Sequence, residues 1–430
     1  MDGGMPEHPK RPWPALPPVL FAVSLAVYSA GLPLGLDRLG GAWPVAAILD
    51  GSGQERVAPL ALMVGRVVAY LPLGDLPTRA NLATALLAAL ALALLGRVCV
   101  DVLVTLRPPP HARQGSQHFM HEPVLATGAV LAGGMALASF HTATSAGAAS
   151  VTLALLAGAW QVALPLLRGE GGTGRGLVLA GLSGLAAGAS PVAAPLLWPL
   201  LFGLCLWELR RGSRWPLLAP VLFVAALGGC LLSSLAVTQN PGGMLHLLAN
   251  TWPRGVQSRS KLLQTAAELC DELGVVGSLL SGVGILVLLK RAPLVAFWFG
   301  FTLLTALMLG SPLAQGGLSL ESGRAGLPVA LLTATIPICA GMAELAGRLG
   351  RARFMTAAVL AALTVVSPAL DGGTSRWQRD THGNERLLEH ALLRSPLRAS
   401  VDPGSVEMEG LLRYGAGLGM RPDLEIRQSR

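Results

Sequence analysis

The sequence predicts an all-α, polytopic membrane protein, and its composition, hydropathy and charge pattern lead to this fold class. Of the 430 residues, 52% are hydrophobic and only 13% are charged, whereas soluble globular domains carry about 25% charged residues. The mean hydropathy is +0.57. Most of the surface therefore cannot face water, which excludes soluble and disordered chains. The five scattered cysteines also exclude a disulfide-stapled domain.

Apolar stretches close to the ~20-residue length that spans a bilayer recur along the chain. We expect about eleven transmembrane helices. They cover residues 19–36, 81–105, 123–141, 146–167, 176–191, 192–208, 216–238, 273–289, 293–312, 326–346 and 354–370. A signal peptide cleaved near Ala30 is the alternative for the first stretch, but its length favours an uncleaved anchor.

Basic residues fall in alternate connections between the predicted helices, and such residues mark the cytoplasmic side. The groups are Lys10/Arg11, Arg107/Arg113, Arg168/Arg175, Arg210/Arg211/Arg214, Lys290/Arg291 and Arg348/Arg351/Arg353. The pattern predicts an inner-membrane protein with a cytoplasmic N-terminal tail (1–18), a transmembrane domain (19–370) and a periplasmic tail (371–430). Its longer outer loops are residues 37–80 and 239–272.

Two outer segments have predicted structure of their own. Residues 57–73 are apolar but too short and too interrupted to span a membrane, which favours an interfacial helix. In the tail, we expect helices at 385–394 and 405–415 and short strands at 397–401 and 424–426, which together form a small α/β unit.

Several motifs follow one another in a recognisable order. The first motif is Gly65-Arg66, and the second is Leu71-Pro72-Leu73-Gly74-Asp75. The third, Arg79-Ala80-Asn81-Leu82, opens an Ala/Leu helix, and residues 181–195 form a Gly-rich helix. An outer segment at 244–264 contains His246 and Gln257. This order resembles bacterial protein O-mannosyltransferase-related membrane proteins, a family of GT-C-like glycosyltransferases.

The resemblance implies a GT-C-like fold and transfer of a sugar from a polyprenyl-phosphate-linked donor to a protein or envelope acceptor on the outer face. Such transfer needs a carboxylate as general base and cations or a metal ion that hold the departing phosphate. Asp37 is the acid placed to act as the base, and Asp50 and Glu55 are weaker candidates for that role. Alternatively, Asp37 has only a structural role and pairs with Arg38. The donor phosphate-binding residues are Arg56, Arg66 and Arg79, and His246 and Gln257 belong to an acceptor or donor loop.

The chain also departs from the family pattern. The Glu that accompanies the family's first acid has no match, Gln54-Glu55-Arg56 replaces a His-Pro-Pro motif, and residues 140–150 contain no acid. Two alternatives therefore stay open. The first is a catalytically degenerate homologue that serves as a lipid-binding or assembly partner, and the second is a secondary transporter.

The remaining motifs are predicted to be structural. His111, His118 and His121 lie beside a Pro-rich connector, so we expect no metal site there. The sequence does not identify which cofactor, if any, the protein uses. Arg97 and Asp101 are four residues apart and are predicted to pair on one helix face. Gly184 and Gly188 have a spacing that allows close helix packing. The partners expected are the sugar donor, membrane lipid and the acceptor, with no nucleic acid.

Overall fold

The structure is a computed structural model. It describes residues 13–32, 59–106, 121–144, 149–170, 172–189, 193–238, 259–309, 319–348, 353–371, 400–401, 406–418 and 425–426. Its elements are α1 (Leu16–Ala30), α3 (Pro59–Ala69), α4 (Leu76–Leu106), α5 (Glu122–Met135), α6 (Leu137–Thr144), α7 (Ala149–Leu167), α8 (Thr173–Ala189), α9 (Ala193–Arg210), α10 (Trp215–Thr238), α12 (Arg259–Arg291), α13 (Pro293–Leu309), α14 (Ser319–Arg348), α15 (Arg353–Asp371), β1 (Ser400–Val401), α18 (Val406–Gly417) and β2 (Glu425–Ile426).

Helices form where the apolar stretches predict them, and the chain is a multi-pass membrane protein. Among the described residues, four helices are long and apolar enough to cross a membrane, and a fifth crossing results if α5 and α6 count as one bent span. Further apolar helices, such as Leu16–Ala30 and Pro293–Met308, are shorter than the ~20 residues that a span needs. The count of eleven crossings therefore stays a prediction.

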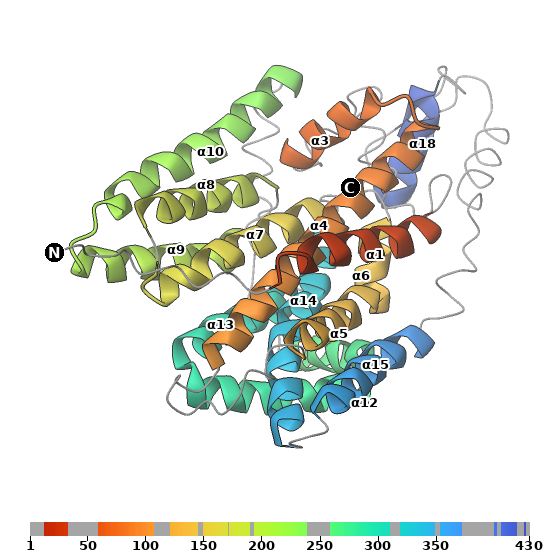
Figure 1. Cartoon of the computed structure of the whole chain (residues 1–430). Coiled ribbons are helices and arrows are strands. Elements are labelled where there is room, and N and C mark those ends of the chain that lie inside the picture. The colour runs from red at the N-terminus through yellow and green to blue at the C-terminus, as the bar shows by residue number, and fades with distance from the viewer. Residues whose placement is uncertain are drawn as a thin grey trace.

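Long helices through the middle of the bundle connect two groups of helices. Figure 1 shows α8, α9 and α10 along one edge, α12 to α15 along the opposite edge, and α4 and α7 between them. α4 packs against α1, α5 and α7, while α12 packs against α14. We call the end where α1 ends and α4 begins the α3 end, and the end where α4 ends and α5 begins the far end.

Glycines allow several of these helices to touch backbone to backbone. A Cβ on Gly184 would lie 2.4 Å from the Phe223 carbonyl oxygen, and one on Gly188 would lie 2.8 Å from the Cβ of Cys230. The predicted packing role of this glycine pair is thus confirmed, with α10 as the partner helix. On the other side of the bundle, a Cβ on Gly284 of α12 would lie only 1.7 Å from the carbonyl oxygen of Pro337 in α14.

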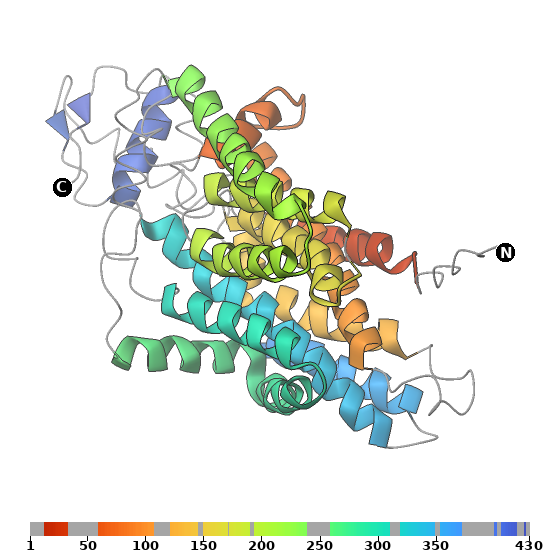
Figure 2. The same cartoon turned by 90° about the vertical axis from the view of Figure 1, so that its left-hand side faces the viewer.

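Two helices differ from their predicted course. The predicted span 123–141 is not continuous, because Ala136 leaves the helical region (φ −52°, ψ 142°) and the axis turns by 76° between α5 and α6. α12 begins well before the predicted span 273–289 and contains a break at Gly274 (φ 66°, ψ 175°). Figure 2 shows the two parts of α12 running in different directions.

The C-terminal segment forms a small α/β unit, as predicted for 405–415, 397–401 and 424–426. α18 accompanies a parallel pair in which Ser400 lies opposite Glu425 and Val401 opposite Ile426. Both views place α18 close to the α3 end (Figures 1 and 2). The predicted helix 385–394 lies outside the described residues, and the periplasmic location of the tail stays a prediction.

Candidate functional site

The corner between α3 and α4 is held by two charged side chains. Oδ1 of Asp75 accepts a hydrogen bond from the backbone N of Thr78 at 3.1 Å, which caps the start of α4. Arg79 reaches back to α3: its Nη1 donates to the Ala69 carbonyl at 2.7 Å and its Nη2 to the Gly74 carbonyl at 2.7 Å. Gly74 has φ +56°, a conformation that glycine adopts readily. Arg79 therefore fixes the end of α3 relative to the start of α4.

This geometry leaves Arg79 little capacity for the predicted role of a phosphate ligand. Its Nε also donates to the Leu73 carbonyl at 2.8 Å, so three of the five N–H groups of the guanidinium are directed at backbone oxygens. Arg79 retains two N–H groups for a phosphate, but its contacts in the structure are those of a positioning residue.

Arg66 has a different environment. It lies on α3 four residues after Leu62, which is only 1% exposed, so both side chains lie on the same face of the helix. The Arg66 Nε is buried and finds no hydrogen-bond partner within the described part of the chain. α3 packs against α4, α8 and α10. Because buried polar atoms are nearly always satisfied, Arg66 is a guanidinium with unused hydrogen-bonding capacity at the α3 end.

A carboxylate from α12 meets the break between α5 and α6. The oxygens Oε1 and Oε2 of Glu272 lie 3.2 and 3.3 Å from the backbone N of Ala138, in the first turn of α6. Negative charge is favourable at a helix N-terminus. Glu272 comes two residues before Gly274, so the break in α12 places its carboxylate against α6.

Glu272 is not among the site residues predicted from the sequence. The family pattern predicts an acid within residues 140–150, where this chain has none, and the carboxylate beside α6 belongs to a residue 134 positions after Ala138. Glu272 is the last residue of the predicted outer loop 239–272, directly before an apolar span. An acid at such a membrane boundary is the signal that would have found it.

Hydroxyl groups satisfy the backbone around α6. The Tyr28 hydroxyl donates to the Gly134 carbonyl at 3.1 Å just before the break, and the Ser150 hydroxyl donates to the Thr142 carbonyl at 3.2 Å. Ser139 is buried, and its Oγ has no partner among the described residues. These polar groups sit within an otherwise apolar bundle, between α1, α6 and α7.

The structure brings only some of the predicted site residues into view. Asp37, Arg56, His246 and Gln257 lie outside the described residues, and their roles stay predictions. Arg66 and Arg79 both belong to the α3 region, as the sequence predicts. Within the described ranges, no three His, Cys, Asp or Glu side chains come together as a metal site would require.

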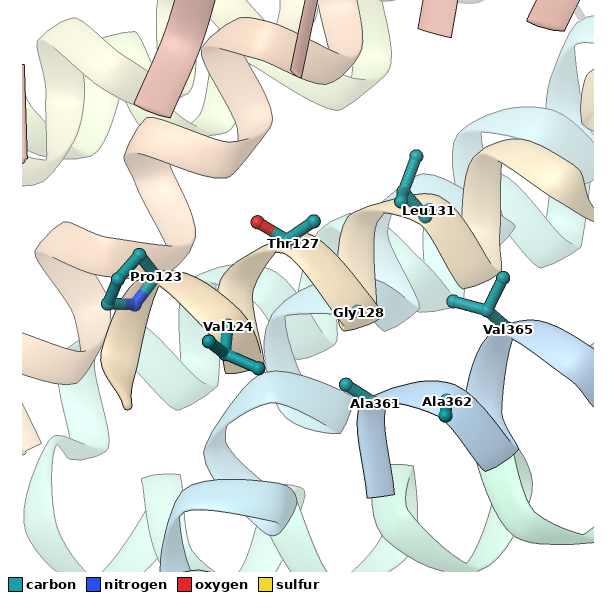
Figure 3. A pocket seen from close by; sticks show the side chains of 8 residues that line it. All are labelled: Pro123, Val124, Thr127, Gly128, Leu131, Ala361, Ala362 and Val365. Carbon is teal, nitrogen blue, oxygen red and sulfur yellow. The ribbon is translucent and has the colours of Figure 1, made fainter. Parts of the chain in front are cut away.

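A groove between α5 and α15 has a different chemical character. It has a volume of 440 Å³. Its lining residues are Pro123, Val124, Thr127, Gly128, Leu131, Ala361, Ala362 and Val365 (Figure 3). None of these side chains is titratable, so the groove is suited to hydrocarbon and not to acid–base chemistry.

Comparison with known proteins identifies the fold. No protein-family profile and no curated protein sequence matches the chain. Among solved structures, apo ArnT from Cupriavidus metallidurans superimposes with a TM-score of 0.58 at 14% identity, covering 95% of this chain and 89% of that chain. ArnT is a GT-C glycosyltransferase. This chain has a GT-C-like fold.

A second ArnT structure, bound to undecaprenyl phosphate, gives the same result. Its TM-score is 0.57 at 13% identity, with 95% of this chain and 89% of that chain covered. The GT-C-like fold expected from the sequence is therefore confirmed. The narrower resemblance to O-mannosyltransferase-related proteins stays a prediction.

Proposed function

We propose that this GT-C-like protein is a membrane glycosyltransferase that moves a sugar from a polyprenyl-phosphate-linked donor to an acceptor hydroxyl. The observation that carries the proposal is the structural match over 95% of the chain to ArnT with undecaprenyl phosphate bound. The finer assignment, a protein or envelope acceptor reached from the outer face, rests on the motifs around Arg66 and Arg79.

In the proposed reaction, the acceptor oxygen attacks the anomeric carbon while the bond from that carbon to the phosphate oxygen breaks. Asp37 takes the proton of the acceptor hydroxyl, and the polyprenyl phosphate leaves with the bonding electron pair, so the configuration at the anomeric carbon inverts. Arg66 stabilises the negative charge that develops on the phosphate, because a guanidinium binds phosphate oxygens in a bidentate manner. Arg79 holds the α3–α4 corner on which Arg66 depends.

The test uses the purified full chain in nanodiscs and a panel of radiolabelled polyprenyl-phosphate sugars. We expect Asp37→Asn to abolish transfer and Arg66→Gln to reduce kcat at least tenfold. Arg348→Gln is the matched control, since Arg348 lies at the far end with a side chain that is 74% exposed, and it should leave transfer unchanged. Transfer that survives Arg66→Gln at the wild-type rate would contradict the phosphate role of Arg66.

The degenerate homologue is the second candidate, and the absence of an acid from residues 140–150 favours it. It predicts that the protein binds a polyprenyl phosphate but turns over no donor in the panel. The secondary transporter gains no support from the GT-C-like fold.

A further inference from the structure

Two turns lie against each other at the far end of the bundle. The first joins α7 to α8 and the second joins α9 to α10; we call residues 168–170 and 211–214 the paired turns. A Cβ on Gly169 (φ +76°) would lie 2.8 Å from Nη1 of Arg211. Nearby, the Trp215 ring covers Gly176, where a Cβ would lie 2.2 Å from Cδ2. The guanidinium of Arg211 is therefore directly beside the α7–α8 turn.

Positive charge is concentrated around the paired turns. The arginines of this region are Arg168, Arg175, Arg210, Arg211 and Arg214, and the acids are Asp101, Glu170 and Glu208. The acids leave an excess of positive charge. Arg211 lies 3.9 Å from Glu208, with the Arg211 side chain 51% exposed, and Arg175 donates to the backbone carbonyl of Glu170, not to its carboxylate.

Arg168 supplies a partly buried cation at the same place. Burial lowers the pKa of its guanidinium, while the carboxylates of Asp101 and Glu170 oppose that shift. One of its terminal nitrogens donates to the Asp101 carbonyl, but its Nε is buried without a partner among the described residues. The region thus combines solvent-accessible guanidinium groups with a buried, unsatisfied donor.

An exposed apolar surface begins directly beside these charges. α9 and α10 lie along one edge of the bundle (Figure 1), and several of their large apolar side chains are exposed. They include Phe202, Leu206, Leu217, Val221 and Val224. Arg210 follows Leu206 by one helical turn, a rise of about 6 Å. Trp207 lies between the arginines and this apolar surface, with Cζ of Arg211 4.9 Å from the centroid of its ring. Tryptophan prefers the membrane–water interface.

We propose that the paired turns bind the headgroup of an anionic phospholipid whose acyl chains lie on the exposed face of α9 and α10. The guanidinium groups of Arg211 and of Arg175, which lies in the first turn of α8 and donates to the Glu170 carbonyl, bind the phosphate oxygens, and the Trp207 ring packs at the level of the glycerol. A soluble anion would make no use of the adjoining apolar face, which is why the observations favour a lipid. This site lies at the opposite end from Arg66 and does not depend on the proposed transferase activity.

The test measures phospholipid binding to the full chain by native mass spectrometry in a neutral detergent, with phosphatidylglycerol and phosphatidylcholine as probes. The variant is Arg175→Gln/Arg211→Gln, which leaves the more buried Arg168 in place. Its matched control is Lys290→Gln/Arg348→Gln, which removes the same charge from the ends of α12 and α14. We expect the first variant to weaken phosphatidylglycerol binding at least tenfold and the control to change it less than twofold.

Three outcomes would overturn the proposal. An equal loss of phosphatidylglycerol binding in both double variants would show diffuse charge attraction. Equally strong binding of phosphatidylcholine would show that the phospholipid charge is not recognised. Displacement of phosphatidylglycerol by millimolar inorganic phosphate would show a soluble-anion site. If Arg175→Gln/Arg211→Gln unfolds below the wild-type temperature, Trp207→Leu serves as the second variant. It retains every charge and should still weaken phosphatidylglycerol binding severalfold; unchanged binding would contradict the site.

Discussion

Replacing Gly284 by alanine tests whether α12 and α14 touch through their backbones. The new Cβ would lie 1.7 Å from the Pro337 carbonyl oxygen and 2.5 Å from the carbonyl carbon. The helices must therefore separate by about 1.7 Å to restore an ordinary contact of 3.4 Å. Overpacking in a filled interior costs about 1–3 kcal/mol, and we expect about 3 kcal/mol here because the obstacle is backbone and not a flexible side chain.

The neighbouring Gly282 provides the control for this experiment. It belongs to the same helix, and a Cβ there would meet nothing within 4 Å, so Gly282→Ala should be neutral or should stabilise α12 by up to ~1 kcal/mol through helix propensity. Thermal unfolding of both variants in nanodiscs, followed by tryptophan fluorescence, measures the difference. Equal unfolding temperatures for the two variants would refute the proposed backbone contact.

Three further predictions follow from the described contacts. Arg79→Ala should destabilise the α3–α4 corner by about 1–2 kcal/mol, because several hydrogen bonds to backbone carbonyls are lost. Amide hydrogen exchange at residues 69–79 should become faster, and an unchanged exchange rate would argue against Arg79 as the residue that holds the corner. Glu272→Ala should cost about 1 kcal/mol as a lost cap of α6, with Glu272→Gln costing less, as judged by thermal unfolding. Cys270, in the first part of α12, is exposed, whereas Cys99 and Cys339 are buried. If the start of α12 faces the periplasm, as predicted for the outer loop 239–272, a membrane-impermeant maleimide should label intact cells at Cys270, and Cys270→Ser should abolish the labelling.

The sequence predicts the helices well because each is encoded locally by an apolar stretch. It also predicts local side-chain pairs: Nε of Arg97 lies 3.7 Å from Oδ2 of Asp101, as their four-residue spacing indicates. The structure adds a donor from the α7–α8 turn, since Arg168 donates to the Asp101 carbonyl. No local pattern shows that a third residue would join this pair.

The break between α5 and α6 was not predicted, because residues around Ala136 continue an apolar run and contain no proline. The α6 start is capped by Glu272, and contacts between distant segments are not visible in hydropathy. The same reason explains the incomplete prediction of the site. The motif identifies Arg66 and Arg79 together, but only the turn geometry reveals that Arg79 is largely engaged with backbone oxygens.

The cap on α6 has a consequence for the order in which the protein is made. α5 and α6 leave the ribosome long before α12, so the carboxylate that caps α6 does not yet exist when they enter the membrane. During synthesis this pair lacks the contact that fixes the start of α6, and the 76° bend reaches its capped form only after Glu272 arrives. The maturation of an early segment is thereby tied to synthesis of the C-terminal half of the chain.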